Sequence, residues 1–148
     1  MKINIKPIGI IYSPYNDLKK IPCQAFKSDK IGRIKVFKKF AKGLKDVEGF
    51  SHITILYYFH KSKDYKLIAK PFFDDKPKGI FAIRSPHRPN HIGVSTVRLL
   101  KVKSNELIVK GIDALNGTPL LDIKPYVPTF DDRSKVKIGW LKGKIKGD

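Results

Sequence analysis

The sequence predicts a mainly β protein, a single-domain antiparallel β-barrel with one short amphipathic helix. Three observations support this fold class: six or seven short runs of β-branched and aromatic residues, turn residues between them, and a single run with helical spacing. The runs do not alternate with helices, which disfavours a doubly wound parallel sheet. A closed or nearly closed antiparallel barrel fits this order of elements best.

The first half of the chain predicts three strands and the helix. Residues 3–12 alternate in polarity and end at Ser13-Pro14, and residues 31–36 alternate over a shorter stretch. Apolar residues at helical spacing predict the amphipathic helix over 37–44. Residues 51–60 are β-branched and aromatic, which predicts a buried strand. His52 and His60 would share one face of that strand, because they lie eight residues apart.

The second half predicts four further strands. They cover residues 79–83, 92–102, 106–112 and a run that begins at 120–123 and is stopped by Pro125. Ser104-Asn105 would form a hairpin turn between the second and third of these strands. From about residue 135 the chain is a Lys-rich tail with apolar anchors at Ile138, Trp140 and Leu141. We expect this tail to pack on the barrel or on a partner subunit.

Length and composition indicate a folded protein of one domain, residues 1–148. No apolar run has the roughly 18 residues that a membrane-spanning helix needs. The N-terminus has no apolar core of a signal peptide. The single cysteine, Cys23, cannot form an internal disulfide. We therefore expect a cytoplasmic protein without membrane contact.

The charge points to a polyanionic partner. The chain has 31 Lys and Arg residues against 13 Asp and Glu residues, a formal net charge of +18. Such an excess attracts nucleic acids, although lysine can also serve only as a solubilising residue. Arginine is rare in this chain, yet Arg84 and Arg88 lie four residues apart in one Pro-rich segment. Because the guanidinium group is a planar fork of donors, this placement indicates a shaped binding site.

Three polar, turn-rich segments are candidates for chemistry. Residues 83–93 combine two Pro, two Arg and two His, and the prolines would hold this loop rigid. Residues 111–118 contain Asp113 and an Asn-Gly turn, whose amides and carboxylate can bind an adenosine edge or a ribose hydroxyl. Residues 121–128 carry Asp122 and Tyr126. An exposed basic turn, a plain turn or a strand-end ion pair would also explain these segments.

Several common sites are missing from the sequence. There is no Rossmann glycine motif and no serine nucleophile elbow, and residues 139–144 are one residue short of a phosphate loop. One cysteine excludes a zinc site with several thiolates. His87 and His91 have the spacing of helical metal ligands, but Pro89 between them disrupts a helix. We therefore expect no metal, and a metal hydrolase would require a bound transition metal.

A series of motifs covers most of the chain. It contains Pro7 to Tyr15, Gly43-Leu44, Gly49 to Ile53, Phe59-His60, Gly79 to Pro86, Arg88-Pro89-Asn90, Ile92-Gly93, Asp113 to Pro119 and Asp122 to Tyr126. In this order the motifs resemble the TsaA-like family, whose characterised members are TrmO-type tRNA adenine-N6 methyltransferases.

The resemblance implies a small antiparallel β-barrel that acts as a homodimer and holds S-adenosylmethionine near the subunit interface. The methyl acceptor in that family is N6 of the modified adenosine 3′ of the anticodon, threonylcarbamoyl-adenosine 37, in threonine tRNA. The cofactor-binding residues that the resemblance implies are Pro22, Cys23, Gln24, His60, Lys61, Arg84, Val94, Lys110, Gly111, Ile112, Asp113, Ala114 and Leu115.

Two positions depart from the family pattern. Cys23 stands where the family has Arg, and His91 stands where it has a second Pro. The chain also ends soon after the Pro-Tyr motif, without the C-terminal extension of some bacterial members. We expect the Lys-rich surface to contact RNA in its place, together with Arg88, Asn90 and Lys124.

The sequence leaves the proton acceptor open between two carboxylates. The transfer needs a group that accepts a hydrogen bond from the exocyclic amine and then takes its proton. Asp122 or Asp113 is the candidate, and Tyr126 would stack on or border the base. The order of an acid and then Pro-Tyr is similar to the Asp-Pro-Pro-Tyr motif of unrelated adenine-N6 methyltransferases, but an ion pair with Lys124 would also explain Asp122. The alternative function is a basic β-barrel that binds RNA without catalysis.

Overall fold

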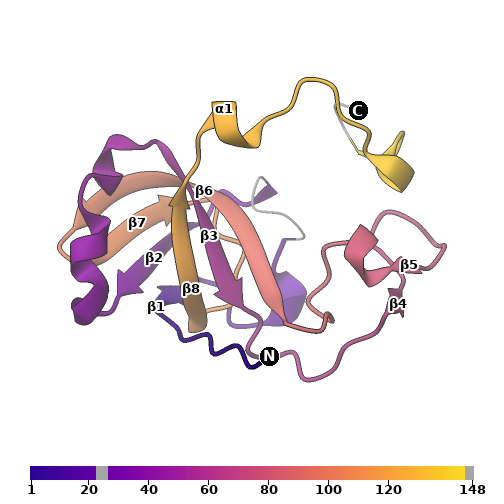
Figure 1. The fold of residues 1–148 in the computed structure, drawn as a ribbon, viewed down its shortest axis with the longest axis horizontal. Helices are drawn as coiled ribbons and strands as arrows, with labels where there is room; N and C mark the ends of the chain where they lie inside the picture. Colours follow the sequence, from indigo (N-terminus) through magenta and orange to yellow (C-terminus); the bar gives the residue numbers. More distant parts are fainter. Residues whose placement is uncertain (23–26, 146–148) are drawn as a thin grey trace.

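The structure, a computed structural model, describes residues 1–22 and 27–145. Its centre is a closed antiparallel barrel with the strand order β1-β2-β7-β6-β3-β8, in which β8 pairs with β1 (Figure 1). The strands are β1 (Gly9–Tyr12), β2 (Ile31–Val36), β3 (His52–Tyr58), β6 (Ile92–Lys103), β7 (Glu106–Lys110) and β8 (Thr118–Pro125). The predicted mainly β, antiparallel barrel is confirmed. That residues 1–148 form one domain stays a prediction.

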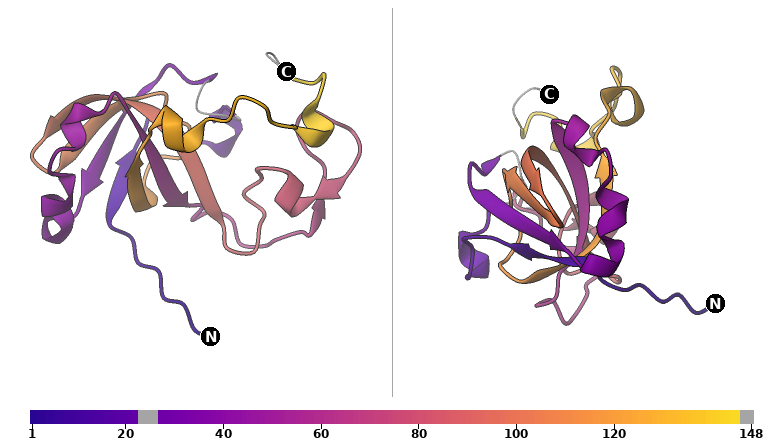
Figure 2. Two further views of the ribbon diagram at one scale, coloured as in Figure 1. Left: turned by 45° about the horizontal axis from the view of Figure 1, so that its top comes forward. Right: turned by 90° about the vertical axis from the view of Figure 1, so that its left-hand side faces the viewer.

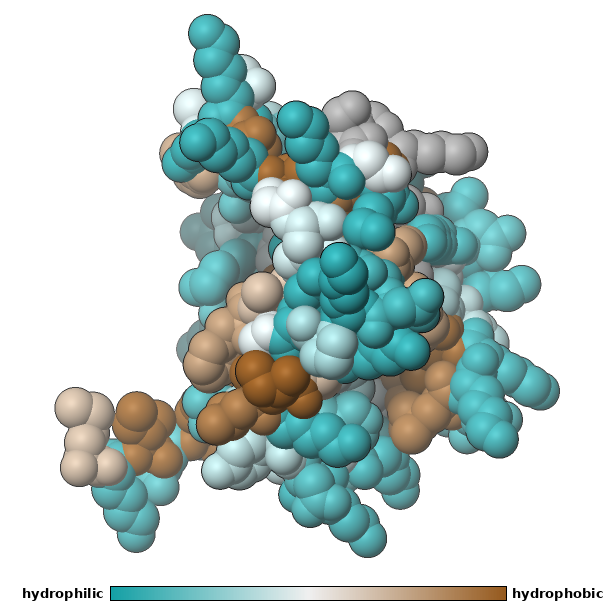
Figure 3. All heavy atoms as spheres, turned by 90° about the vertical axis from the view of Figure 1, so that its right-hand side faces the viewer, coloured by the Kyte–Doolittle hydropathy of each residue, from teal (hydrophilic) through white to brown (hydrophobic). Residues whose placement is uncertain are grey.

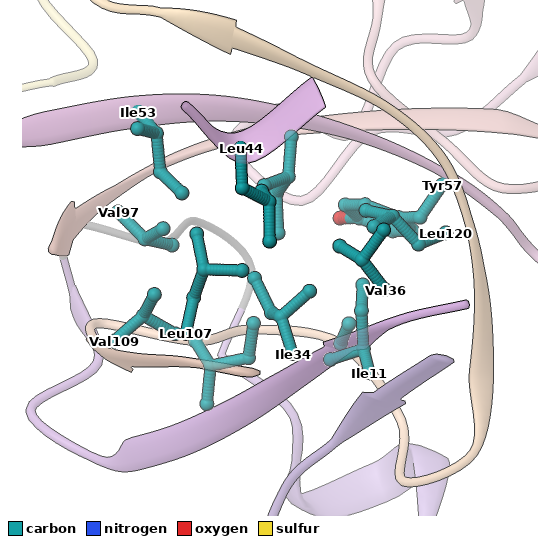
Figure 4. Close-up of a cluster of buried hydrophobic side chains, with 13 residues drawn as sticks. Ile11, Ile34, Val36, Leu44, Ile53, Tyr57, Val97, Leu107, Val109 and Leu120 are labelled. Carbon is teal, nitrogen blue, oxygen red and sulfur yellow. The ribbon is translucent and has the colours of Figure 1, made fainter. Parts of the chain in front are cut away.

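Strict alternation of inward and outward side chains builds the core. In β2, every second residue is buried, and β3 repeats this pattern from Ile53 to Tyr57. The inward residues are mostly branched aliphatic ones, which fill a small barrel without polar atoms (Figure 4). Ile11, Ile34, Ile53, Ile55, Leu107 and Leu120 are fully buried. Burial of one such side chain contributes about 1.5–3 kcal/mol, so this cluster carries much of the stability of the barrel.

The closed barrel has two ends that differ in the length of their connections. Residues 13–30, 59–91 and 111–117 link strands at one end, which we call the loop end. The opposite end carries residues 37–51, with η3 (Lys38–Leu44) and η4 (Val47–Gly49), and the predicted hairpin turn at Ser104-Asn105. Ser104 has φ 56°, in the left-handed region that such turns require.

The longest connection leaves the barrel and forms an arm, residues 59–91 (Figures 1 and 2). The arm contains the two-stranded sheet of β4 (Ile68–Ala69) and β5 (Lys78–Gly79), followed by η5 (Ile80–Ala82). The C-terminal segment carries α1 (Pro128–Asp131) and η6 (Gly139–Leu141) and reaches the arm. There Trp140 Nε1 donates to the carbonyl oxygen of Ala82 at 2.8 Å. The tail, which we expected on the barrel or on a partner subunit, therefore contacts the arm through Trp140.

The predicted helix over 37–44 is a 3₁₀ helix. Its hydrogen bonds span three residues, as between the amide of Phe40 and the carbonyl oxygen of Phe37 at 2.8 Å. Phe37 and Phe40, like Ala41 and Leu44, are three residues apart, and this spacing aligns side chains in a 3₁₀ helix. Phe40 and Leu44 pack against the core, so the segment is amphipathic as predicted.

Three predicted strands differ most from the observed ones. The first strand is only Gly9–Tyr12, and the preceding residues are exposed up to Lys6. The third ends at Tyr58 because the amide of His60 turns back to the carbonyl oxygen of Tyr58 at 2.8 Å. His52 and His60 therefore do not share one strand face, and that prediction was wrong. Residues 79–83 were wrongly predicted as a strand, since only Gly79 pairs and η5 follows it.

Across residues 1–22 and 27–145, no helix is long and apolar enough to cross a membrane.

Candidate functional site

The loop end joins two segments that are about 100 residues apart in sequence. The Ser13 hydroxyl donates to the carbonyl oxygen of Ala114 at 2.6 Å, and the Ser13 amide donates to Asn116 Oδ1 at 3.1 Å. Gly111, with φ 92°, allows the chain to turn after β7, and its amide bonds to the carbonyl oxygen of Lys30. These bonds fix the loop that carries Asp113.

A chain of three hydrogen-bonding side chains ends at the Asp113 carboxylate. The Ser95 hydroxyl donates to Asp113 Oδ1 at 2.5 Å, and the hydroxyls of Tyr57 and Ser95 lie 3.0 Å apart. Tyr57 and Ser95 face the barrel interior from β3 and β6, with exposed fractions of 4% and 5%. Burial raises the pKa of the Asp113 carboxyl, although the hydrogen bond from Ser95 opposes this shift. Asp113 is thus the predicted carboxylate that the fold holds in a fixed position.

Arg84 and His60 lie on the arm that leaves the same end. Arg84 is exposed, and none of the described residues gives its side chain a hydrogen bond or an ion pair. Burial and the Asp113 charge raise the pKa of Tyr57, and the charge of Arg84 opposes this shift. Burial and the charge of Lys61 lower the pKa of the half-buried His60, which keeps its imidazole neutral at pH 7. The loop end therefore offers a free cation, a held carboxylate and a neutral imidazole.

The turn from Lys110 to Leu115 divides into core residues and accessible ones. Gly111, Ile112 and Ala114 are buried, and Ile112 and Ala114 belong to the core. Lys110 is exposed, while Asp113 and Leu115 are half-buried. The side chains of Ile112 and Ala114 thus fill the barrel, and any ligand contact of these residues is through their backbone.

The Pro-rich loop of residues 83–93 is held by its own arginine. Arg88 donates from Nη1 to the carbonyl oxygens of Ile83 and Ser85, at 2.9 and 3.2 Å. His91 has φ 50°, which proline cannot adopt because its ring fixes φ near −65°. The departure from the family's proline therefore permits the backbone found here. Asn90 is exposed beside these residues.

A second group of predicted residues lies on the outer face of β6, β3 and β8, which we call the sheet face. Val94, Leu56 and Asp122 form one row across the three strands, and Thr96, Thr54 and Lys124 form the next. Val94 is 45% exposed, and Asp122 has a side-chain exposure of 47%. Asp122 Oδ2 lies 3.0 Å from Lys124 Nζ. Tyr126 follows in a third row beside His52, with its ring centroid 6.3 Å from that of the imidazole.

The structure therefore brings the predicted residues together in two groups. Asp113 lies in the connection 111–117 at the loop end and Asp122 on the sheet face, so the two candidate acceptors do not share one face. Two strand spacings separate Val94 from Asp122, about 10 Å, and four residues along β8 separate Asp122 from Tyr126, about 13 Å. The Tyr126 hydroxyl donates to Asp132 Oδ1 at 2.7 Å. Val94, near the start of β6, lies where the sheet face meets the loop end.

The remaining candidate cofactor residues come from the third connection of the loop end. Pro22 is half-buried in the loop of residues 13–30, whereas Cys23 and Gln24 lie outside the described residues. Within residues 1–22 and 27–145, no three His, Cys, Asp or Glu side chains gather as metal ligands.

Tyr57 and Ser95 were not identified as site residues from the sequence, because both belong to runs that fit ordinary buried strands. Their only signal is a hydroxyl at an inward position.

The fold and the site define a small β-barrel protein with polar, hydrogen-bonded loops at one end and an Asp122–Lys124 ion pair on its outer sheet face. A family model described as the tRNA-methyltransferase O N-terminal domain matches residues 10–132. The chain belongs to this family.

Relatives and solved structures agree with this assignment. The chain is 49% identical over 146 residues to a probable S-adenosyl-L-methionine-binding protein of Pyrococcus abyssi, covering 98% of this chain and 79% of that protein. It is 40% identical over 107 residues to a tRNA (adenine(37)-N6)-methyltransferase of Homo sapiens, covering 70% of this chain and 24% of the human one. The crystal structure of TrmO from Pseudomonas aeruginosa matches 94% of this chain with a TM-score of 0.80 and 36% identity. This chain spans 62% of that solved chain.

Proposed function

We propose that this protein is an S-adenosylmethionine-dependent tRNA methyltransferase that acts on N6 of adenosine 37, the threonylcarbamoyl-adenosine 3′ of the anticodon. The observation that carries the proposal is the loop end, where three connections far apart in sequence bring together the described candidate cofactor residues. Family membership and the names of the relatives support the cofactor and the substrate class. Its tRNA substrate also makes the cytoplasm the expected location.

The residues of the loop end fit the cofactor. Arg84 has a guanidinium without a partner among the described side chains, which suits the carboxylate of the methionyl group. Asp113 offers a held carboxylate for a hydroxyl or amine of the adenosine. His60, Lys61 and the backbone of residues 110–115 complete this end, and Val94 borders it from the sheet face. When bound, the cofactor supplies a methyl group on a positively charged sulfur.

We assign the acceptor side to the sheet face. Asp122 is half exposed and within about 10 Å of Val94, so a base placed over Leu56 can reach it. Its carboxylate would accept a hydrogen bond from the exocyclic amine, keep the nitrogen lone pair available and take the proton. Asp122 also has partners, the Ile123 amide at Oδ1 and Lys124 Nζ at Oδ2, but both are its neighbours on β8 and its side chain stays 47% exposed. Asp113 is less suited to this part because it is bonded to the buried Ser95 hydroxyl. Tyr126 would border the base or a neighbouring nucleotide.

RNA binding is assigned to the surface charge. Lys124 lies on the sheet face and Asn90 on the Pro-rich loop, and both are exposed. Arg88 donates two of its five N–H groups to carbonyl oxygens of the loop, and the other three can bind a phosphate. The net charge of +18 supports long-range attraction of tRNA.

The proposal includes a homodimer, for which the arm provides support. Tyr65, Leu67, Ile68, Phe72 and Phe81 are all more than half exposed, with 88% for Phe72. Figure 3 shows hydrophobic atoms exposed among hydrophilic ones on the side that carries the arm. Contiguous exposed apolar side chains are typical of protein interfaces. A partner subunit that covers them would also close the loop end.

One experiment tests the whole proposal. Purified protein is incubated with labelled S-adenosylmethionine and tRNA, either carrying or lacking threonylcarbamoyl-adenosine 37, and the nucleosides are analysed by mass spectrometry. Label on N6 of adenosine 37 in the modified tRNA alone is the expected result. Label on both tRNAs retains the enzyme but removes the modified substrate. Retained RNA binding without label would favour the non-catalytic barrel, and bound cofactor in the purified protein would argue against it.

A further inference from the structure

The barrel interior contains one polar chain in an otherwise aliphatic core. Ser95 and Thr118 are the only polar residues counted as buried in the described chain, and the Tyr57 hydroxyl is the polar atom drawn within the core cluster (Figure 4). Thr118 stabilises the turn that precedes it, because its hydroxyl donates to the carbonyl oxygen of Leu115 at 2.6 Å. Tyr57 and Ser95 instead connect to a carboxylate. Buried hydroxyls are costly unless they are bonded, and Phe and Ala would fill the same space.

The hydroxyl protons of Tyr57 and Ser95 can be arranged in only one way along these hydrogen bonds. An ionised carboxylate can only accept, so the one proton of Ser95 points to Asp113 Oδ1. The Ser95 oxygen is then the acceptor for the Tyr57 hydroxyl. Burial and the Asp113 charge raise the pKa of Tyr57, which keeps the phenol neutral and a donor. Both hydroxyls are therefore directed toward the Asp113 carboxylate.

The position of the Tyr57 ring depends on Gly93. A Cβ at Gly93 would lie 2.7 Å from Tyr57 Cζ, too close for any real side chain. Glycine thus leaves the space in which the ring lies against the backbone of β6. The ring of Phe59 packs edge-on against Tyr57, with centroids 5.4 Å apart. Packing on both sides holds the phenol in place, so the hydrogen-bond chain starts from a rigid group.

We infer that Tyr57 and Ser95 are positioning residues, which hold the Asp113 carboxylate in the orientation that binds the adenosine of the methyl donor. This inference rests on the proposed function. Ser95 and the backbone amide of Asp113 are the donors to the carboxylate among the described residues. The remaining acceptor capacity of the carboxylate is available to hydroxyls or amines of the ligand. A carboxylate that is already oriented loses less entropy when it binds.

The test compares Ser95→Ala, Tyr57→Phe and the conservative variant Ser95→Thr by calorimetry with S-adenosylmethionine. Thr96→Val is the matched control. Thr96 is the next residue of β6 and faces outward, and this variant loses a similar hydrogen bond, the one to Thr54 at 3.1 Å. We expect Ser95→Ala to weaken affinity about 10-fold and Tyr57→Phe about 3-fold, while Ser95→Thr and Thr96→Val stay within about 2-fold. The single-turnover rate at saturating cofactor should not change, because the effect is on binding.

A double-mutant cycle with Asp113→Asn separates positioning from general stability. If Ser95 acts through Asp113, Ser95→Ala should have little further effect on affinity in the Asp113→Asn background. Loss of the Ser95 bond should also raise the pKa of Asp113, so cofactor binding should weaken at a higher pH than in the wild type. Additive effects, or an unchanged affinity and pH profile in a folded Ser95→Ala variant, would overturn the inference. If Ser95→Ala does not fold, Tyr57→Phe decides by the same cycle.

The inference and the proposed function fail in different ways. If the wild-type protein binds no S-adenosylmethionine, the proposed function is wrong and the inferred role in binding falls with it. If the wild type binds and Asp113→Asn weakens binding, but Ser95→Ala and Tyr57→Phe do not, only the inference fails. Titration of the Asp113 carboxyl by NMR without ligand checks the network separately, and an unchanged pKa in Ser95→Ala would contradict it.

Discussion

The loop end and the sheet face hold polar groups in different ways. At the loop end, Asp113 is bonded to a buried serine, which is itself bonded to a buried tyrosine. On the sheet face, Asp122 is half exposed, accepts a hydrogen bond from the Ile123 amide and pairs with the exposed Lys124, a type of ion pair worth about 0–1 kcal/mol. The first arrangement suits a small ligand that needs a rigid site. The second leaves its carboxylate accessible and suits a large substrate that arrives from solvent.

The largest expected effect separates the two carboxylates. Asp122→Asn should lower the single-turnover rate at saturating cofactor about 1000-fold, because an amide cannot take the proton of the amine. Its affinity for S-adenosylmethionine should stay within about 2-fold of the wild type, since the side chain lies outside the loop end. Rapid-quench measurement of labelled tRNA gives the rate, and calorimetry gives the affinity.

Asp113→Asn is the matched variant and should show the opposite pattern, with weakened cofactor binding and a small change in rate once cofactor is saturating. If Asp122→Asn and Tyr126→Ala both keep near-native rates, the sheet face does not hold the acceptor. If only Asp113→Asn lowers the rate, the proton acceptor is Asp113 at the loop end and not Asp122.

The second effect concerns the cation of the loop end. Arg84→Ala should weaken S-adenosylmethionine binding about 100-fold, because it removes charge-assisted bonds to a carboxylate. Its melting temperature should not fall, since no described side chain bonds to Arg84. Arg98→Ala, which removes an exposed arginine of β6 instead of one on the arm, is the control and should bind normally. Unchanged affinity in calorimetry of Arg84→Ala would remove this residue from the cofactor site.

Strand patterns were the part of the fold that the sequence predicted best. The alternation in residues 31–36 and the run of 92–102 gave correct strands because one face of each is buried. Within the arm the sequence predicted one strand, residues 79–83, and missed β4 and β5, because such short strands carry little periodicity. The end of β3 was also misplaced, because Phe59 and His60 are as suited to a strand as the residues before them.

The candidate site was predicted as residues but not as an arrangement. The sequence identified Asp113 and Asp122 together, and only the register of β8 against β3 shows that Asp122 faces outward. A bulge between Leu56 and Tyr57 shifts that register, and no sequence pattern predicts this bulge. The Tyr57–Ser95 pair depends on contacts across β3 and β6, which are 38 residues apart, so periodicity within one strand cannot reveal it.

A pH dependence should distinguish the two regions next. Burial raises the pKa of Asp113, so its carboxylate takes up a proton at a higher pH than an exposed aspartate does. Affinity for S-adenosylmethionine should be constant above this pKa and fall about 10-fold per pH unit below it, since one proton competes with the ligand. Calorimetry over a series of decreasing pH measures this limb, which Asp113→Asn should abolish and Asp122→Asn should retain.

The smallest effect concerns RNA on the sheet face. Lys124→Ala should weaken tRNA binding about 3-fold at moderate salt and reduce the slope of log affinity against log salt by about 1, because one phosphate contact is lost. Lys101→Ala, which removes an exposed lysine of β6, is the control for loss of charge alone. Fluorescence anisotropy over a salt series gives both slopes. Equal slopes for the two variants would mean that the sheet face attracts RNA only through net charge, and a flat wild-type slope would make lysine a solubilising residue throughout.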